Sequence, residues 1–183
     1  MRRLLLALPL ALLPLVMAHA HDEHESLAPH EHGAGSLNVA LDDKTLELDL
    51  DGPSVNLVGF EHVATSDADK ATVAAARAQL ENPLVLFALP KAANCVVEAQ
   101  DLSSPLFNPA PEQGATKAKT EHHHSDIEAH YAFTCQNPEA LKTLNLAHFF
   151  KAFPGTHKIK VQVIGNSGQQ GVEVTPAAPT VTF

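Results

Sequence analysis

The stretch SLNVALDDKTLELDLDGP, residues 36–53, decides the fold. Apolar residues occupy alternate positions on both sides of the Asp42-Asp43 pair: Leu37, Val39 and Leu41 before it, and Leu46, Leu48 and Leu50 after it. Successive side chains of a strand point to opposite faces of the sheet, so this pattern predicts a β-hairpin with one buried face and one solvated face.

Further elements are predicted outward from this hairpin. Strands are expected at 94–99, at 127–135, at 157–164 with 169–175, and at 180–183, and residues 55–60 are expected to continue as an irregular strand. A helix is expected after Ser66, a residue type that caps helices, and it must end before Pro83; a second, short helix is expected at about 138–146. These elements predict an α+β fold: a small β-rich domain with two short helices. The order strand, proline turn, helix, apolar run and strand occurs twice, which is a weak indication of two pseudosymmetric halves.

Residues 1–20 have the pattern of a secretory signal peptide. Arg2 and Arg3 precede an apolar run from Leu4 to Met17, and Ala18-His19-Ala20 fits the small-x-small rule for cleavage before His21. The run is too short to span a bilayer, for which about 20 apolar residues are needed. We therefore expect a soluble periplasmic protein that does not insert into the membrane after cleavage.

The chain is acidic, with 21 Asp and Glu residues against 12 Lys and Arg residues and a formal net charge of −9. Nucleic acids and anionic lipid surfaces are bound through Lys and Arg, so this balance argues against both as partners and favours metal cations.

Cys95 and Cys135 are the two cysteines of the chain. In an oxidising compartment they are expected to form a disulfide, and their spacing is too wide for a CxxC motif. A redox role or thiolate metal ligation is the weaker alternative.

Three segments concentrate histidine with acidic residues. We expect a flexible His-rich arm at 21–35 and a zinc-binding domain at 36–183, which carries a mobile His-rich loop at about 103–125. The candidate metal ligands are His30, His32, Glu61, His62, His122, His123, His124, Asp126, Glu128 and His130. Asp126, Glu128 and His130 lie at spacing two, so one face of a strand would present them together. The expected defined site is His124, Asp126, Glu128 and His130, with His62 nearby and with His30 and His32 as the amino-terminal contributors.

Imidazole and carboxylate ligands without free thiolate suit Zn²⁺, and Cu²⁺ is expected to bind the same ligands in vitro. An incidental His-rich segment is the alternative explanation for any single cluster.

Several segments together resemble the ZrgA-type periplasmic zinc-uptake family. They are His30 to Gly33, Leu37 to Leu41, Leu57 to His62, Ala92 to Cys95 and Tyr131 to Cys135. The resemblance implies a zinc-binding protein that assists import across the inner membrane. The His-rich segment between the cysteines is shorter here than is usual in that family.

The favoured hypothesis is a periplasmic zinc-binding accessory protein, not an enzyme, that captures Zn²⁺ and hands it to a zinc ABC transporter or to the binding protein of that transporter. A zinc-dependent hydrolase is the first alternative, with Glu61 or Glu128 as base, although the chain has no HExxH motif. A structural secreted module with incidental histidines is the second alternative.

Overall fold

The hairpin predicted from residues 36–53 is present in the computed structural model, which describes residues 31–107, 125–165 and 168–183. Strand β1 (Ala34–Asp42) pairs with β2 (Thr45–Pro53) in antiparallel register, with Leu37 opposite Leu50 and Val39 opposite Leu48. These four side chains are buried. The alternation in the sequence therefore places one face of the hairpin in the core, as predicted.

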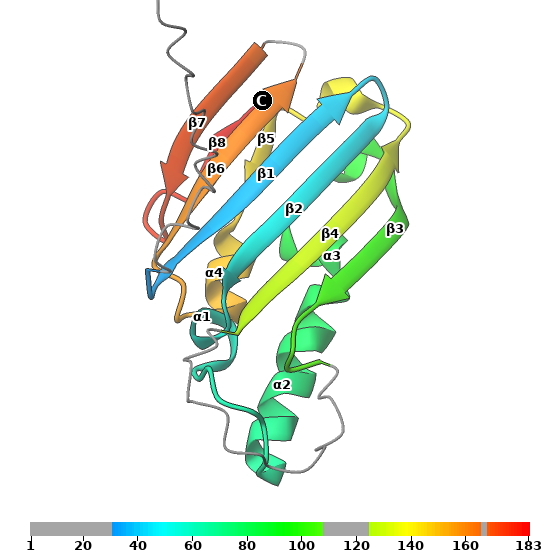
Figure 1. Ribbon diagram of the computed structural model, residues 1–183. Coiled ribbons are helices and arrows are strands. Elements are labelled where there is room, and N and C mark those ends of the chain that lie inside the picture. The colour runs from blue at the N-terminus through cyan, green and yellow to red at the C-terminus, as the bar shows by residue number, and fades with distance from the viewer. Residues whose placement is uncertain (1–30, 108–124, 166–167) are drawn as a thin grey trace, which may run out of the picture.

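The hairpin lies at the centre of a six-stranded sheet with the order β3-β4-β2-β1-β6-β7 (Figure 1). The other strands are β3 (Cys95–Ser103), β4 (Asp126–Cys135), β6 (Lys158–Gly165) and β7 (Gly168–Val174). Neighbouring strands are antiparallel except β1 and β6, which run parallel. A separate two-stranded sheet is formed by β5 (Thr143–Asn145) and β8 (Thr180–Thr182).

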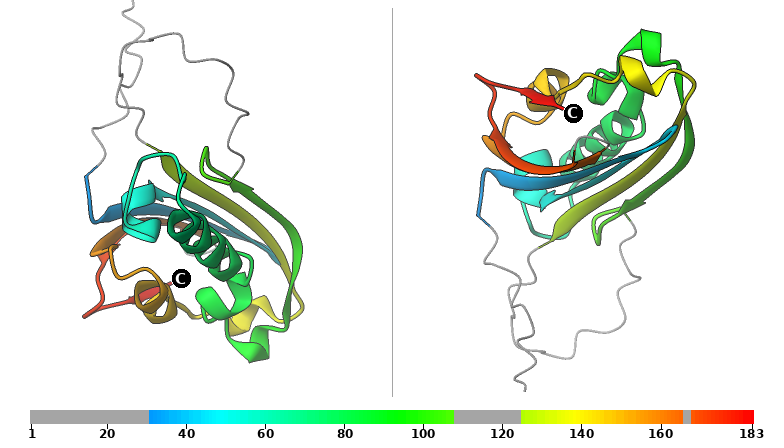
Figure 2. Two further views of the ribbon diagram at one scale, coloured as in Figure 1. Left: turned by 90° about the horizontal axis from the view of Figure 1, so that it is seen from below. Right: turned by 90° about the horizontal axis from the view of Figure 1, so that it is seen from above.

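All helices lie on one side of the large sheet, on its concave face (Figure 2). They are α1 (Ser54–Val58), α2 (Asp67–Leu80), α3 (Pro83–Leu86) and α4 (Ala147–Ala152), with short 3-10 turns η1 (Lys91–Ala93) and η2 (Pro138–Ala140). The opposite face of the sheet has no helix over it in the described residues. The domain is therefore an α+β fold with one covered and one open sheet face.

Helix α2 begins where the sequence predicts. The Ser66 side chain accepts a hydrogen bond from the Asp69 backbone N–H at 3.0 Å, and Asp67 and Asp69 lie in the first turn, where the helix dipole favours negative charge. The helix ends at Leu80, before Pro83. The buried Tyr131 hydroxyl of β4 donates to the Leu80 carbonyl at 2.9 Å and fastens this end of the helix to the sheet.

The core between the sheet and the helices is rich in phenylalanine. Phe87, Phe133, Phe149 and Phe153 are at most 1 % exposed, and Phe87 meets Tyr131 edge to face with ring centroids 5.5 Å apart. Aromatic pairs in this geometry stabilise a core beyond the area that they bury.

Two segments differ from the prediction. The strand expected at residues 55–60 is wrong, because residues 54–58 form helix α1. The helix expected at 138–146 is also wrong: η2 and strand β5 occupy this segment, and α4 begins only at Ala147. Strand β5 exists because it pairs with β8, nearly 40 residues further along the chain, and local periodicity carries no information on that pairing. The described residues contain four α-helices rather than the two expected.

The repetition predicted from the sequence is only partly present. Strand β2 is connected through helices to β3, and β4 is connected through α4 to β6, and each connection joins parallel strands. However, β3 lies directly beside β4, whereas β1 separates β6 from β2. Both halves run from a strand through helical segments to a parallel strand, but the second half also contains β5, and the halves differ in their place in the sheet.

The predicted disulfide joins Cys95 and Cys135, which face each other across β3 and β4. It links the beginning of the edge strand β3 to the end of its neighbour β4. The disulfide prediction is confirmed.

The segment expected to be a loop at about 103–125 is only partly described. Its first residues pack on the domain, since Leu106 and Phe107 are buried, and so is Ser125 at its far end. Residues 108–124 lie outside the described residues, as do the segment expected to be a signal peptide at 1–20 and the greater part of the expected arm at 21–35. In the parts of the chain that are described, no helix combines the length and apolar character needed to cross a membrane.

Candidate metal-binding site

The site is built at the end of the sheet where β1 begins and β2 ends. His32 precedes Gly33, which has a φ of +84°. A side chain at Gly33 would also meet the ring of His157, whose Nδ1 lies 2.7 Å from the position of a Cβ atom. Only glycine fits both conditions, so the turn that follows His32 depends on Gly33.

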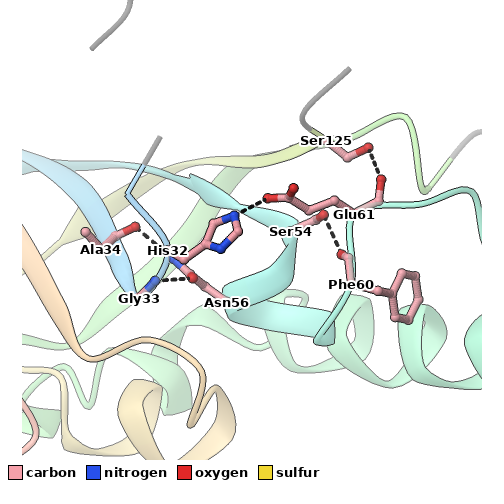
Figure 3. Close-up of polar contacts among 8 residues, drawn as sticks. All are labelled: His32, Gly33, Ala34, Ser54, Asn56, Phe60, Glu61 and Ser125. Atoms are coloured by element: carbon pink, nitrogen blue, oxygen red, sulfur yellow. Dashed lines mark hydrogen bonds and ion pairs between the residues drawn. The ribbon is translucent and has the colours of Figure 1, made fainter. Parts of the chain in front are cut away.

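Asn56 of α1 fixes the backbone next to His32 (Figure 3). Its side-chain oxygen accepts from the Gly33 N–H at 2.7 Å, and its side-chain nitrogen donates to the Ala34 carbonyl at 2.8 Å. Asn56 is only 3 % exposed. A buried amide that satisfies one donor and one acceptor of the same turn holds that turn in one conformation.

Two buried serines fix the backbone around Glu61 in the same way. The Ser54 hydroxyl donates to the Phe60 carbonyl at 2.7 Å, and the Ser125 hydroxyl donates to the Glu61 carbonyl at 3.1 Å. The Ser54 N–H donates to the Ser125 carbonyl at 2.7 Å. Helix α1 and the start of β4 therefore position the loop that carries Glu61.

These supports bring two predicted ligands together. The Nε2 atom of His32 lies 3.2 Å from Oε1 of Glu61, and Figure 3 shows the two side chains pointing toward each other. The Glu61 side chain is 22 % exposed, whereas the His32 side chain is 63 % exposed. The pair thus has a partly buried carboxylate and an exposed imidazole, and both groups are of the kinds that bind zinc.

His62, another predicted ligand, follows Glu61 directly but is placed differently. Its ring stacks on Phe60 with centroids 4.6 Å apart, and its Nδ1 atom lies 3.1 Å from the Val63 carbonyl oxygen. His62 is exposed. The stacking on Phe60 and the contact with the Val63 carbonyl orient the His62 ring.

The predicted ligands on β4 lie on the open face of the sheet. Asp126, Glu128 and His130 alternate with the buried Ile127 and Ala129, as the spacing predicts. The Nδ1 atom of His130 lies 2.5 Å from Oδ1 of Asp49 on β2, and the two residues are opposite in register. Asp49 was not among the predicted ligands, because the pairing of β2 with β4 is a long-range contact. Glu128 lies opposite Asp51.

Of the described candidates, the structure pairs His32 with Glu61 and places His130 against Asp49, which was not a candidate, whereas His62, Asp126 and Glu128 belong to neither of these two pairs. Among residues 31–107, 125–165 and 168–183, no group of three or more histidine, cysteine or acidic side chains converges closely enough to hold a metal ion. The candidates His30, His122, His123 and His124 lie outside the described residues. Asn56, Ser54 and Ser125 were also missed, because residues 55–60 were expected to form an irregular strand and Ser125 was expected to lie in a mobile loop.

Comparison with known protein families matches residues 29–183 to a family described as "ZrgA family zinc uptake protein". No curated protein matches the chain. The match begins just before His30 and runs to the last residue, so it covers both pairs and the disulfide. Because the match spans most of the chain, the protein belongs to the ZrgA family of zinc uptake proteins, and the suspected family is confirmed.

Proposed function

We propose that this protein is a periplasmic zinc-binding accessory protein that captures Zn²⁺ at the His32–Glu61 pair and supports its import. The observation that carries the proposal is the 3.2 Å separation of His32 Nε2 and Glu61 Oε1. Family membership supports a role in zinc uptake, and the site, the compartment and the transfer of zinc to an import system are our proposal.

The separation of the two atoms matches that of neighbouring ligands on one zinc ion. Zinc binds imidazole nitrogen and carboxylate oxygen at about 2.0–2.2 Å in tetrahedral geometry, which places two ligand atoms about 3.3–3.5 Å apart. His32 and Glu61 need little movement to reach that separation. A pair that is already in place loses less conformational freedom on binding than a pair that must first be assembled.

The remaining ligands are available in the neighbouring sequence. His30 precedes His32 by two residues, and the histidine triplet 122–124 ends immediately before Ser125. Ser125 is hydrogen bonded to the Glu61 backbone, and consecutive Cα atoms are 3.8 Å apart. Chain connectivity therefore ties both His-rich segments to the position of the pair, and we propose that they complete the zinc coordination.

The proposal is tested by zinc titration of the purified protein against a chromophoric chelator. Glu61→Gln removes the charge of the side chain but keeps its shape and leaves the hydrogen bond to the Glu61 backbone carbonyl in place. His32→Gln removes the imidazole. Each change should weaken the tightest zinc step by at least about tenfold, since loss of even an outer-shell partner costs that much at zinc sites. The double variant should add little to either single variant, because both changes disable one site.

His148→Gln is the matched control, since His148 is exposed on α4, an element that supplies neither residue of the pair nor the side chains that fix its backbone. It should leave the tight step unchanged. If His148→Gln weakens zinc binding as much as His32→Gln does, the pair is not a defined site. If His130→Gln removes the tight step and His32→Gln spares it, the site lies on β4, as the sequence spacing predicts, and the placement proposed here is wrong.

A further inference from the structure

Two hollows lie next to each other on the helical side of the molecule. The first has a volume of about 570 Å³ and is lined by Leu57 of α1 and by residues of α2, α3 and α4, among them Ala75, Leu86 and Lys151. The second, of about 390 Å³, lies between α3, η1 and the start of β3, and it is lined by Leu89 and Cys95 among others. Figure 2 shows these helices together on the concave side of the sheet.

One exposed residue joins the two hollows. Val85 lines both of them and is 63 % exposed, and its neighbour Leu84 is 40 % exposed. The rest of α3 is anchored, because Leu86 and Phe87 are almost completely buried. The fold therefore holds two apolar side chains outward on a fixed helix. We call the surface formed by the two hollows and Val85 the Val85 surface. Exposed apolar patches of this kind mark interaction sites.

The charge around the Val85 surface is basic in an otherwise acidic chain. Lys151 and His148 line the first hollow and Lys91 lines the second, and no Asp or Glu is among the residues that line either one in the described structure. The whole chain has 21 acidic residues and 12 Lys and Arg residues. A surface that combines apolar side chains with lysines and has no acidic lining residue complements a ligand that combines apolar side chains with carboxylates.

We infer that the Val85 surface binds an acidic amphipathic segment of a partner protein. Such a segment would place apolar side chains into the two hollows on either side of Val85 and carboxylates against Lys91 and Lys151. This is the helix-in-groove mode of peptide recognition, in which apolar anchors one turn apart supply most of the affinity. The small extent of the two hollows fits a transient contact rather than a permanent complex.

A second copy of this chain is a poorer occupant. A symmetric dimer through this surface would bring the same patch of both copies together, and Lys91 and Lys151 would then face the cations of the other copy. The like charges would oppose that contact.

The test uses a synthetic 14-residue helical peptide with leucines one turn apart and glutamates elsewhere, and a second peptide in which lysine replaces every glutamate. The acidic peptide should shift backbone amide resonances of α3, α4 and η1 in the purified protein, and the basic peptide should not. Val85→Glu should weaken binding of the acidic peptide at least tenfold. Val63→Glu is the matched control, because Val63 is 64 % exposed and lines neither hollow.

Equal binding of both peptides, equal effects of Val85→Glu and Val63→Glu, or no binding of the acidic peptide at millimolar concentration would each overturn the inference. A dimer in sedimentation that Val85→Glu dissociates, or binding to anionic vesicles in preference to the acidic peptide, would assign the surface to another occupant and overturn it as well. Zinc titration of Val85→Glu should match the unchanged protein, so the outcome is independent of the proposed zinc site.

Discussion

Asn56 offers the most direct test of how the fold positions His32 and Glu61, the proposed zinc-binding pair. Its side chain accepts from the Gly33 N–H and donates to the Ala34 carbonyl, and it is 3 % exposed. Asn56→Ala removes both hydrogen bonds and leaves a buried backbone donor and a partly buried acceptor without this partner. Asn56→Asp retains the acceptor for Gly33 but replaces the donor to Ala34 with a second oxygen.

The cost follows from the burial of the two backbone groups. A buried polar group that loses its partner costs about 1–3 kcal/mol. Water can reach the partly buried Ala34 carbonyl, so the loss there should lie at the low end of that range. Asn56→Ala should therefore lower the free energy of unfolding by about 2–4 kcal/mol. For a domain of this size, that is a fall in Tm of about 5–15 °C.

Urea unfolding followed by circular dichroism measures this change, and zinc titration of the same variant measures its effect on the pair. Asn137→Ala is the control, because the exposed Asn137 side chain makes one hydrogen bond to the Ala92 carbonyl at 3.0 Å. The control should cost less than about 1 kcal/mol and leave zinc binding unchanged. If Asn56→Ala costs no more than the control, or if it destabilises the fold but leaves zinc affinity intact, Asn56 does not hold His32 in place.

Three further predictions concern the disulfide, proton competition and the core. Replacing Cys95 and Cys135 with serine should lower the free energy of unfolding by up to about 4 kcal/mol, the chain-entropy value for a loop of this length. The folded double variant should keep its tightest zinc-binding step, and loss of that step would indicate that the thiols are ligands. Zinc affinity should fall from pH 7.5 to pH 5, because imidazole must lose its proton to bind metal, and equal affinity at both pH values would argue against histidine ligands. Burial raises the pKa of Tyr131 well above its ordinary value of about 10, so the unfolded chain releases this proton first, and stability should fall as the pH rises beyond about 10. Tyr131 is the chain's single tyrosine, so tyrosinate absorbance follows it alone, and the alkaline loss should be smaller in Tyr131→Phe; ionisation near pH 10 in the folded protein would refute this.

The sequence predicted the elements whose pattern is local. The central hairpin, the start and end of α2, strand β4 and the hairpin of β6 and β7 all follow from alternation, capping residues and turn residues. Strand β3 was placed correctly but is longer than residues 94–99, because its second half pairs with β4 in spite of an irregularity between Val97 and Ala99. The elements that were wrong, α1 and β5, depend on packing or on pairing with distant residues.

The members of the proposed zinc-binding pair could be named from the sequence, but their association could not. His32 and Glu61 were both candidate ligands, and they lie 29 positions apart. They meet because β1 and β2 form a hairpin, which brings residues near its open end together, and because α1 turns the chain back across that end. Residues 55–60 were expected to continue as a strand, whereas residues 54–58 form α1. The change of direction at α1 and the role of the buried Asn56 were therefore not predicted. Asp49 was missed for a similar reason, since its contact with His130 requires the register of β2 on β4.

The distribution of buried polar side chains supports this end of the sheet as the functional one. In the described part of the chain the buried polar residues are Ser54, Asn56, Ser104, Ser125 and Thr156. Ser54, Asn56 and Ser125 hold the backbone on the two sides of the pair, and Thr156 follows Gly155, which packs so tightly on the Asn56 carbonyl that a Cβ atom there would lie 2.7 Å from it. Burying polar groups adds little net stability compared with apolar packing, and each group requires a correctly placed partner. A fold that needed only stability could use apolar residues here. Their concentration around His32 and Glu61 fixes the backbone geometry at this one place, and this supports the proposed metal site, because ligands work best when they are held in position before binding.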